Sequence, residues 1–283
     1  MIQLSHDRPA AAIALVCVAT FCFVAMNACV KTLSSSLTVL EIIWGRYFFH
    51  MIITALLFPA IICKFFKTPR RDLQILRSVL VLGATSFAFT ALKFIPIATL
   101  TAVGFIGPII VVTLAACFLK ERVSIRRWVA IAFGFFAVLV ILRPGLGNLD
   151  WAMWLPILMA ACYAGYQVMT RLLRGMASPQ ITLFYSALVG TVVTTILLPW
   201  NWETPQLSHW ILMVASGLLG CGGHLALIRA YECAPASIAA PFVYSELIWA
   251  VGMGWIFFGH FPDFWTWVGA ILLVSTGIYL IKR

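Results

Sequence analysis

Ten long apolar stretches follow one another along this chain, with only short connections between them. A hydrocarbon core about 30 Å thick requires roughly 20 apolar residues in each helix that crosses it. Continuous runs of this length favour helices over barrel strands, in which apolar and polar residues alternate. The sequence therefore predicts an all-α membrane protein with ten transmembrane helices in a single membrane domain, residues 1–283. The stretches cover residues 10–30, 38–62, 73–92, 97–118, 128–142, 151–172, 180–199, 209–230, 237–258 and 264–281.

Basic residues are distributed unevenly over the connections and chain ends. Fourteen fall on one alternating side of the expected membrane and three on the other. Cytoplasmic loops carry such an excess of Lys and Arg, so both termini are expected in the cytoplasm. The net charge of +10 is then a signal of topology and of contact with anionic lipid heads, not of nucleic-acid binding. The larger group is Arg8, Lys64, Lys67, Arg70, Arg71, Lys120, Arg122, Arg126, Arg127, Arg171, Arg174, Arg229, Lys282 and Arg283; the smaller is Lys31, Lys93 and Arg143.

The two halves of the chain align with each other at an offset of 139 residues. Gly83 aligns with Gly222 and Pro96 with Pro235, and the hydropathy pattern keeps the same register. Five helices is an odd number, so the second half is expected to enter the membrane in the opposite orientation to the first. Inverted repeats of this kind are typical of secondary transporters, although a duplication without transport is the alternative. The expected repeats are residues 10–143 and 149–283.

Residues 89–145 and their second-half counterpart resemble the EamA repeat of the drug/metabolite transporter superfamily. The resemblance rests on the Ala-Leu before Pro96, the Lys-Glu-Arg corner at 120–122, Arg46 in the second helix and the glycine-rich closing helix of each half. It covers essentially the whole chain. The second half departs from the pattern, because Gly-His-Phe at 259–261 replaces the acidic corner.

This resemblance implies a secondary active transporter in the bacterial cytoplasmic (inner) membrane, and more specifically an exporter of a small amphipathic or zwitterionic metabolite such as an amino acid or its derivative. It also admits transport of S-adenosylmethionine or of amino-acid-derived metal chelators. The residues themselves show no phosphate-binding loop, so a gradient, with protons as a candidate coupling ion, or exchange would supply the energy. Zincin and serine-hydrolase motifs are missing too, which argues against an enzyme. A non-transporting scaffold is the remaining alternative.

No cofactor is expected, and the scattered cysteines do not predict a metal site, since they form no CxxC pair and no zinc-like spacing with His. The oligomeric state, monomer or homodimer, is left open by the sequence.

Two charged residues lie deep in apolar stretches. Arg46 is about eight residues, or roughly 12 Å, into the second stretch, and Glu246 lies near the middle of the ninth. Charges at such depth face the bundle interior and pair with a partner or a substrate. We expect Arg46 and Glu246 to pair, either permanently or until a substrate brings its own carboxylate and ammonium. Glu246 as a proton-coupling site is the third interpretation.

Other polar and aromatic residues at related depths are candidate cavity-lining groups. For each tyrosine, and for His224, an ordinary packed core position is the competing interpretation. Glu41 is a second coupling candidate, although a carboxylate at a helix N-terminus also complements the helix dipole. The substrate-binding candidates are Arg46, Glu246, Tyr163, Tyr166, Gln167, Tyr185, His224, Tyr244, Trp44 and Trp249.

Glycine and proline mark the positions where the helices are expected to bend. Gly104, Gly107 and Pro108 lie inside the fourth stretch and Pro241 inside the ninth, and helices broken at corresponding positions of two repeats point to a binding region. Glycines in the eighth stretch are expected to permit close helix contacts. These are Gly217, Gly220 and Gly223.

Overall fold

Helices account for nearly all of the computed structural model, which describes residues 8–65, 68–107, 109–111, 113–114, 125–142, 151–173, 176–200, 202–233 and 240–281. Short 3-10 turns, η1 (Trp151–Trp154), η2 (Leu198–Trp200) and η3 (Ala240–Tyr244), lie beside α8, α9 and α12. The α-helices are α1 (Pro9–Leu33), α2 (Val39–Leu57), α3 (Ala60–Phe65), α4 (Arg71–Phe94), α5 (Ile97–Gly104), α7 (Ile125–Leu142), α8 (Leu155–Leu172), α9 (Pro179–Leu197), α10 (Leu207–Cys233), α12 (Ser245–Phe258) and α13 (Phe264–Ile281).

Each of the ten predicted stretches contains helix, and the helix bounds refine the predicted ones. Within the described ranges, six helices are long and apolar enough to cross a membrane, and four shorter apolar helices accompany them. The second stretch is divided into α2 and α3, because Phe58 precedes Pro59 and leaves the helical conformation, with φ −134° and ψ 66°. The chain is thus an all-helical, multi-pass membrane protein.

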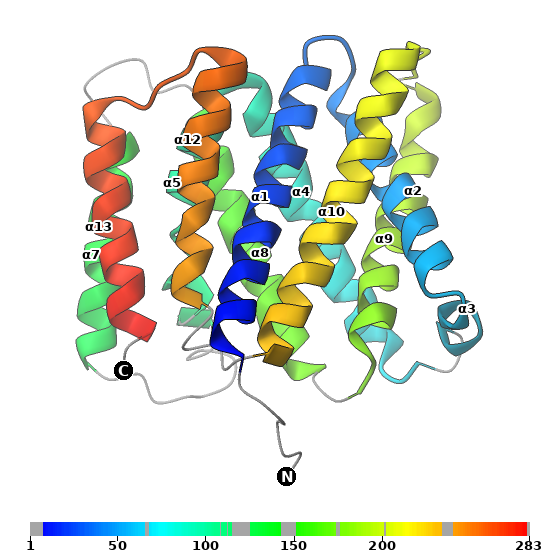
Figure 1. The fold of residues 1–283 in the computed structure, drawn as a ribbon, viewed down its shortest axis with the longest axis horizontal. Helices are drawn as coiled ribbons and strands as arrows, with labels where there is room; N and C mark the ends of the chain where they lie inside the picture. The colour runs from blue at the N-terminus through cyan, green and yellow to red at the C-terminus, as the bar shows by residue number, and fades with distance from the viewer. Residues whose placement is uncertain are drawn as a thin grey trace.

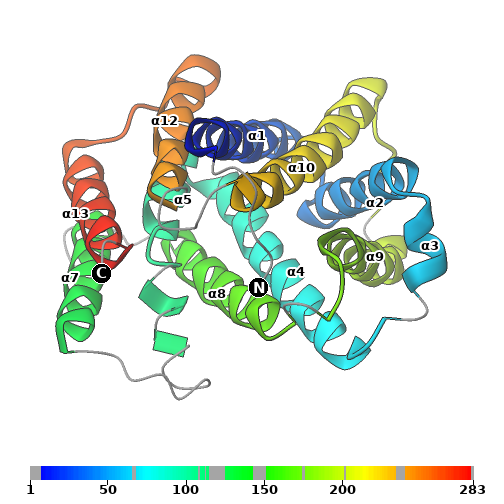
Figure 2. The ribbon, with the colours of Figure 1, turned by 60° about the horizontal axis from the view of Figure 1, so that its bottom comes forward.

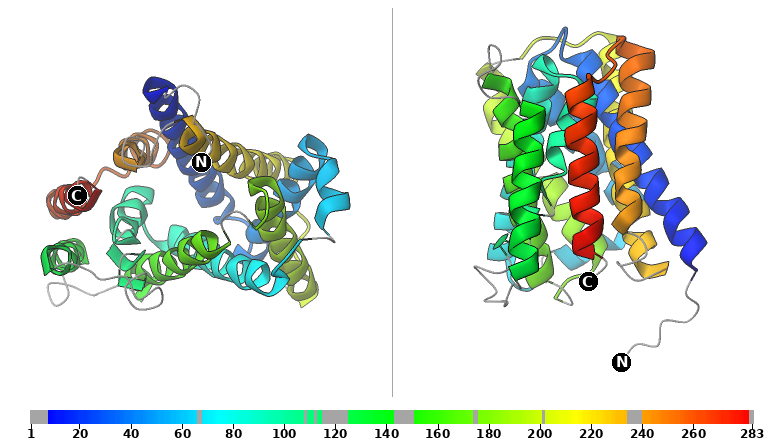
Figure 3. Two further views of the ribbon diagram at one scale, coloured as in Figure 1. Left: turned by 90° about the horizontal axis from the view of Figure 1, so that it is seen from below. Right: turned by 90° about the vertical axis from the view of Figure 1, so that its left-hand side faces the viewer.

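The long helices stand side by side, and α1 begins and α13 ends at the same end of the bundle (Figure 1). We call this end the terminal face. Contacts are most extensive between α1 and α10, between α4 and α8, and between α7 and α13. Figure 2 and Figure 3 show the α7–α13 pair at one edge of the molecule and α3 at the other.

Helices that correspond at the offset of 139 residues occupy corresponding positions. The bounds of α7, Ile125–Leu142, shifted by this offset give those of α13, Phe264–Ile281. The pairing of α1 with α10 likewise corresponds to that of α8 with α4.

Equivalent helices of the two halves also run in opposite directions. Lys31, near the end of α1, donates hydrogen bonds to the carbonyls of Leu92 and Ile95 at the end of α4, so α1 and α4 are parallel. The Arg8 amide at the start of α1 donates to the Cys233 carbonyl at the end of α10, so these two helices are antiparallel. Therefore α4 and α10, which correspond at the offset, point opposite ways.

Several helix ends follow local sequence rules. Thr38 and Glu41 form a capping box at the start of α2, and Ser178 caps α9 with Pro179 in its first turn. Gly259 ends α12 in the left-handed conformation, φ 66°, which glycine adopts without a Cβ clash.

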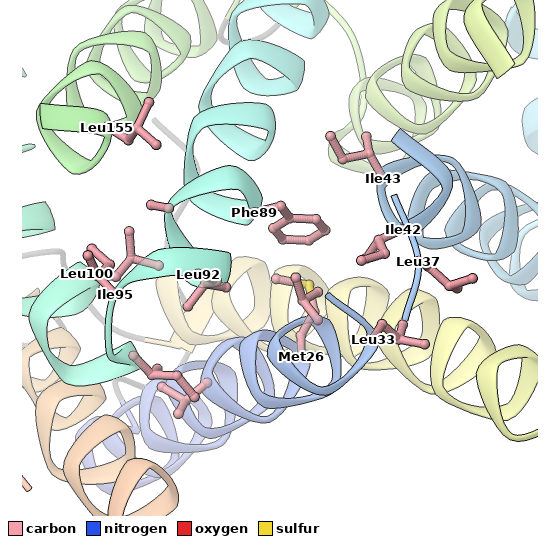
Figure 4. Close-up of a cluster of buried hydrophobic side chains, with 14 of the residues drawn as sticks. Met26, Leu33, Leu37, Ile42, Ile43, Phe89, Leu92, Ile95, Leu100 and Leu155 are labelled. Carbon is pink, nitrogen blue, oxygen red and sulfur yellow. The ribbon is translucent and has the colours of Figure 1, made fainter. Parts of the chain in front are cut away.

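Two large apolar clusters and a small one, at Val16 and Ala230, lie inside the described part of the bundle. The larger joins α1, α2, α4 and α5, and Figure 4 shows Met26, Ile42 and Phe89 converging in it from the first three of these helices. The second cluster joins α5, α7, α8, α12 and α13, with Val103, Ile141 and Leu247 among its buried members. The charged side chains described next lie beside these clusters, in surroundings that supply few polar partners.

Candidate functional site

Arg46 of α2 is a buried cation held by weak partners. Its side chain is 4% exposed. Nε donates to the Met26 sulfur over 3.2 Å, and Nη1 donates to the Thr85 hydroxyl over 3.2 Å. The guanidinium carbon also lies 4.5 Å from the ring centre of Tyr47 and 5.8 Å from that of Phe89, within cation–π range. A thioether is a poor acceptor and the rings are neutral, so the positive charge has no anionic counterpart in the described part of the chain.

Glu246 of α12 lies near the middle of the bundle. The neighbouring Ser245 hydroxyl is 2.9 Å from the hydroxyl of Thr20, which stands at the midpoint of α1. The Glu246 side chain is partly buried, and among the described residues it makes no hydrogen bond and no ion pair. Its position in the first turn of α12 places it where the helix dipole favours a negative charge.

The expected ion pair between Arg46 and Glu246 is not formed in this structure. Within the described ranges the salt bridge present is Arg70–Asp72, at 3.3 Å on the surface. Arg46 contacts α1 at Met26, and Ser245, the residue before Glu246, contacts α1 at Thr20, six residues away or about 9 Å along a helix axis. Among the described residues neither Arg46 nor Glu246 pairs with an opposite charge.

On η3, α12 and the adjacent helix α5, three buried polar atoms have no hydrogen-bond partner among the described residues. They are the Tyr244 hydroxyl, the Trp249 indole nitrogen and the Thr101 hydroxyl of α5. Trp249 stands one turn after Glu246 on α12 and packs edge-to-face on Phe21, with ring centres 5.5 Å apart. Buried polar groups are normally satisfied, so unsatisfied donors beside an unpaired carboxylate indicate a place for a ligand or for water.

His224 of α10 belongs to the Arg46 side of the bundle. Its ring centre lies 6.0 Å from that of His50 and 5.0 Å from that of Phe23. His224 was predicted either to line the cavity or to pack in the core, and the structure places it beside His50, one turn from Arg46 on α2. No three His, Cys, Asp or Glu side chains gather into a metal-binding group within the described ranges.

Arg77 of α4 is a buried cation that our sequence analysis did not single out. It is 4% exposed, and its guanidinium donates to the Tyr166 hydroxyl over 2.6 Å and to the Thr170 hydroxyl over 2.6 Å, both on α8. It also donates to the Ser186 hydroxyl over 2.9 Å and to the Thr182 carbonyl over 3.0 Å, both on α9. We call this set the Arg77 latch.

The Arg77 latch contains one of the predicted tyrosines, Tyr166, and a second, Tyr163, packs on it. The Tyr166 ring lies 4.2 Å from the Arg77 guanidinium carbon and stacks on Tyr163, with ring centres 5.3 Å apart. Tyr166 therefore joins α4 to α8 near the terminal face instead of standing beside Arg46. An arginine inside an apolar stretch is the signal that also marked Arg46, and it applies equally to Arg77.

Three other candidates lie away from both deep charges. The Tyr185 ring packs on Phe65 of α3, with ring centres 4.4 Å apart, and its hydroxyl donates to the Phe65 carbonyl over 3.4 Å. Trp44 donates to the Thr195 hydroxyl over 2.9 Å and stacks within an aromatic group at the end opposite the terminal face. Gln167 is exposed.

Glu41 is fully buried and its carboxylate is used structurally. One oxygen accepts from the Thr38 amide over 2.9 Å and from the Thr38 hydroxyl over 2.8 Å; the other accepts from the Glu203 amide over 2.6 Å. These bonds cap α2 and attach it to the connection before α10. The dipole-and-cap interpretation accounts for this geometry, and a coupling role for Glu41 stays a prediction.

The predicted bends fall at helix breaks. Helix α5 ends at Gly104, a turn at Phe105 and Ile106 follows, and helix resumes at Gly107. In the second half the 3-10 turn η3, which contains Pro241, leads into α12. Pro108 lies outside the described residues.

The two breaks correspond at the offset of 139 residues and they meet in space. Phe105 corresponds to Tyr244, and their rings pack edge-to-face with centres 5.0 Å apart. Equivalent residues can touch each other only near the axis that relates the two halves, so the breaks lie beside that axis, next to Glu246.

The sequence of this chain is similar to those of several known membrane transporters. The chain is 29% identical over 255 residues to a "S-adenosylmethionine uptake transporter" of Rickettsia conorii, covering 89% of this chain and 85% of that one. It is 31% identical to a "Riboflavin transporter" of Rhizobium johnstonii, covering 68% and 64%. It is 28% identical to a "Pseudopaline exporter CntI" of Pseudomonas aeruginosa, covering 95% of each.

A crystal structure at 14% identity superposes with a TM-score of 0.68 over 99% of both chains, which shows a common fold. The pattern of one transporter family matches twice, at residues 10–143 and at residues 150–283. Family and relatives alike indicate a transporter and not an enzyme. The chain belongs to the EamA-like transporter family.

Proposed function

We propose that this protein is a secondary active transporter of a small zwitterionic or amphipathic metabolite, such as an amino acid or an amino-acid derivative, across the bacterial inner membrane. Transport proceeds by alternating access, and export is the favoured direction. The observation that carries the proposal is the presence of two opposite, unpaired charges inside the bundle, Arg46 and Glu246. An isolated charge in the interior is costly, so a ligand that compensates both has a strong reason to bind.

The separation of the charges favours a certain size of substrate. The contacts of Arg46 and of Ser245, next to Glu246, on α1 are about 9 Å apart along the axis. An elongated molecule with a carboxylate at one end and a cationic or amine group further away fits this separation, with Tyr244 and Trp249 lining its second end.

An inverted repeat supports the alternating-access mechanism. The family pattern matches twice, helix bounds shift by 139 residues, and α4 and α10 run in opposite directions. In such transporters the substrate lies between the repeats near discontinuous helices. The contact between the helix breaks at Phe105 and Tyr244, next to Glu246, supports a substrate site there.

The relatives support the substrate class without fixing the compound or the direction. One is named for uptake of S-adenosylmethionine and another for export of pseudopaline. S-adenosylmethionine carries a carboxylate and a distant sulfonium, and is therefore a good first candidate for a site with this charge spacing. Riboflavin, named for a third relative, has no carboxylate and fits it less well.

Uptake by proteoliposomes tests the proposal. Labelled S-adenosylmethionine and a pool of labelled amino acids are offered at two luminal pH values to wild type, to Glu246→Gln and to Glu203→Gln. Glu203 has an exposed side chain and serves as the matched control. We expect wild type and Glu203→Gln to accumulate one compound. Exchange without accumulation by Glu246→Gln would identify Glu246 as the coupling site, and lost binding would identify it as a substrate contact. Equal behaviour of all three proteins would refute the assignment of Glu246.

A further inference from the structure

Gly220 of α10 lies against three side chains, from α1 and α2, without placing a side chain of its own between them. A Cβ built on Gly220 would lie 3.6 Å from Arg46 Nε, 3.6 Å from His50 Nδ1 and 3.3 Å from the sulfur of Met26. Arg46 and His50 are four residues apart on α2 and therefore share one face of that helix. Two nitrogen atoms from successive turns thus approach one point, and α10 places no side chain there.

His50 is the second nitrogen-bearing group at this point, and it has no partner. The side chain is 2% exposed, and both ring nitrogens are buried without a hydrogen bond. A neutral imidazole carries one N–H donor and one acceptor nitrogen, and both positions remain unused here. A buried unsatisfied ring of this kind calls for a ligand that the resting structure does not supply.

The charges around His50 identify the kind of ligand. Arg46 lies on the same helix and His224 faces His50 from α10, with ring centres 6.0 Å apart. Helix α1 contributes the uncharged side chain of Met26 at this point. Within the described residues no acidic side chain pairs with Arg46 or His50. A cluster of one permanent cation and two bases, without an acid, is suited to an anion.

We infer that Arg46, His50 and Gly220 form the carboxylate subsite of the transported metabolite. The carboxylate accepts hydrogen bonds from the guanidinium and from the N–H of His50, beside the backbone of α10, where Gly220 places no side chain against either group. Met26 has a flexible side chain and moves aside, exchanging a weak thioether acceptor for a charge-assisted one. This inference rests on the proposed transport function and specifies which end of the substrate binds between α2 and α10.

Two glycine substitutions on one helix provide the test. Gly220→Ala fills the point between Arg46 and His50, whereas a Cβ on Gly222 meets nothing within 4 Å. Both changes add one methyl group to the interior of α10. His50→Phe is a third variant, which keeps an aromatic ring of similar size but removes both nitrogens.

Binding is measured by isothermal titration on the purified chain in detergent, with pairs of compounds that differ in the carboxylate. The pairs are S-adenosylmethionine with its decarboxylated form, L-methionine with L-methioninamide, and L-histidine with histamine. We expect one carboxylate compound to bind wild type and Gly222→Ala with equal affinity. The carboxylate-free compound of the same pair should bind with an affinity at least about tenfold lower. In Gly220→Ala and His50→Phe the carboxylate compound should bind no better than its partner does.

Each outcome decides the inference. Equal binding of carboxylate and carboxylate-free compounds, binding of none of them, or retention of the preference in Gly220→Ala overturns the subsite. Weakening by Gly222→Ala to the same degree overturns it as well, because the effect would then be one of helix packing. Uptake in proteoliposomes without any carboxylate preference would leave transport standing and the subsite refuted. A carboxylate preference in binding without uptake would refute transport and leave the subsite standing.

Discussion

Replacing Arg77 with methionine tests whether the Arg77 latch stabilises the bundle. Methionine has a comparable length and fills the apolar part of the space, so the main loss is the four hydrogen bonds to Tyr166, Thr170, Thr182 and Ser186. Polar interactions between membrane helices contribute about 0.6 kcal/mol each on average, with a maximum of about 1.7 kcal/mol. Four average bonds give about 2.4 kcal/mol. The two 2.6 Å bonds place the expected loss at or above this value.

The assay is reversible unfolding of the purified protein in mixed micelles of increasing denaturing detergent, followed by circular dichroism. We expect Arg77→Met to lower the free energy of unfolding by about 2–3 kcal/mol, and Tyr166→Phe, which removes one of the four bonds, to lower it by about 0.6 kcal/mol. An Arg77→Met protein within about 0.5 kcal/mol of wild type would refute the latch. So would a Tyr166→Phe protein as unstable as Arg77→Met, because the loss would then belong to the tyrosine and not to the arginine.

Two further substitutions test local packing and capping. Gly217→Ala places a Cβ 2.6 Å from the Phe49 Cβ and 2.9 Å from the His50 amide nitrogen. This overpacking should lower the free energy of unfolding by about 1–3 kcal/mol. A Gly217→Ala protein as stable as Gly222→Ala would show that α2 and α10 pack less closely than in this structure. Glu41→Ala removes the capping carboxylate of α2 and should lower the free energy of unfolding by about 1–2 kcal/mol, measured by the same unfolding assay. Proton-driven uptake should be retained in this variant. Loss of proton coupling in a stably folded Glu41→Ala protein would instead identify Glu41 as a coupling residue.

The sequence was sufficient for the helices because their length and hydropathy are set by the membrane. It was also sufficient for the depth of Arg46 and Glu246, since depth follows from position within an apolar stretch. It could not supply the partners of Arg46, because the approach of Met26 and Thr85 depends on how α1 and α4 rotate and pack against α2. The depth of Glu246 in the membrane stays a prediction, and the predicted contact with Arg46 is absent from this structure.

Helix rotation and chain breaks explain the remaining differences. Gln167 and Tyr166 are both substrate-binding candidates, yet one residue corresponds to about 100° of rotation on a helix, and Gln167 is exposed whereas Tyr166 contacts Arg77. Tyr185 packs on α3, which sequence reasoning had merged with the second helix. The space at Gly220 required the structure, because an interfacial glycine looks the same in sequence whether it serves packing or binding.

Contacts between the two halves at opposite ends of the bundle bear on the proposed transport cycle. At the terminal face a charged group of the first half, Arg77, donates four hydrogen bonds to the second half. At the other end the halves meet through the Glu41 carboxylate and the Glu203 amide, and through the Trp44 indole and the Thr195 hydroxyl. Alternating access requires one set to break while the other holds.

The two sets of contacts between the halves differ in what it costs to break them, and this difference bears on the direction of transport. Breaking the Arg77 latch leaves a buried guanidinium without acceptors, whereas the Glu41 carboxylate keeps both Thr38 bonds when it releases Glu203. Opening at the end opposite the terminal face therefore costs less. If the terminal face is cytoplasmic, as the basic residues predict, then the ligand-free protein favours an outward-facing state. In the proposed export direction, a substrate arriving from the cytoplasm would then have to compensate by its binding for the open Arg77 latch.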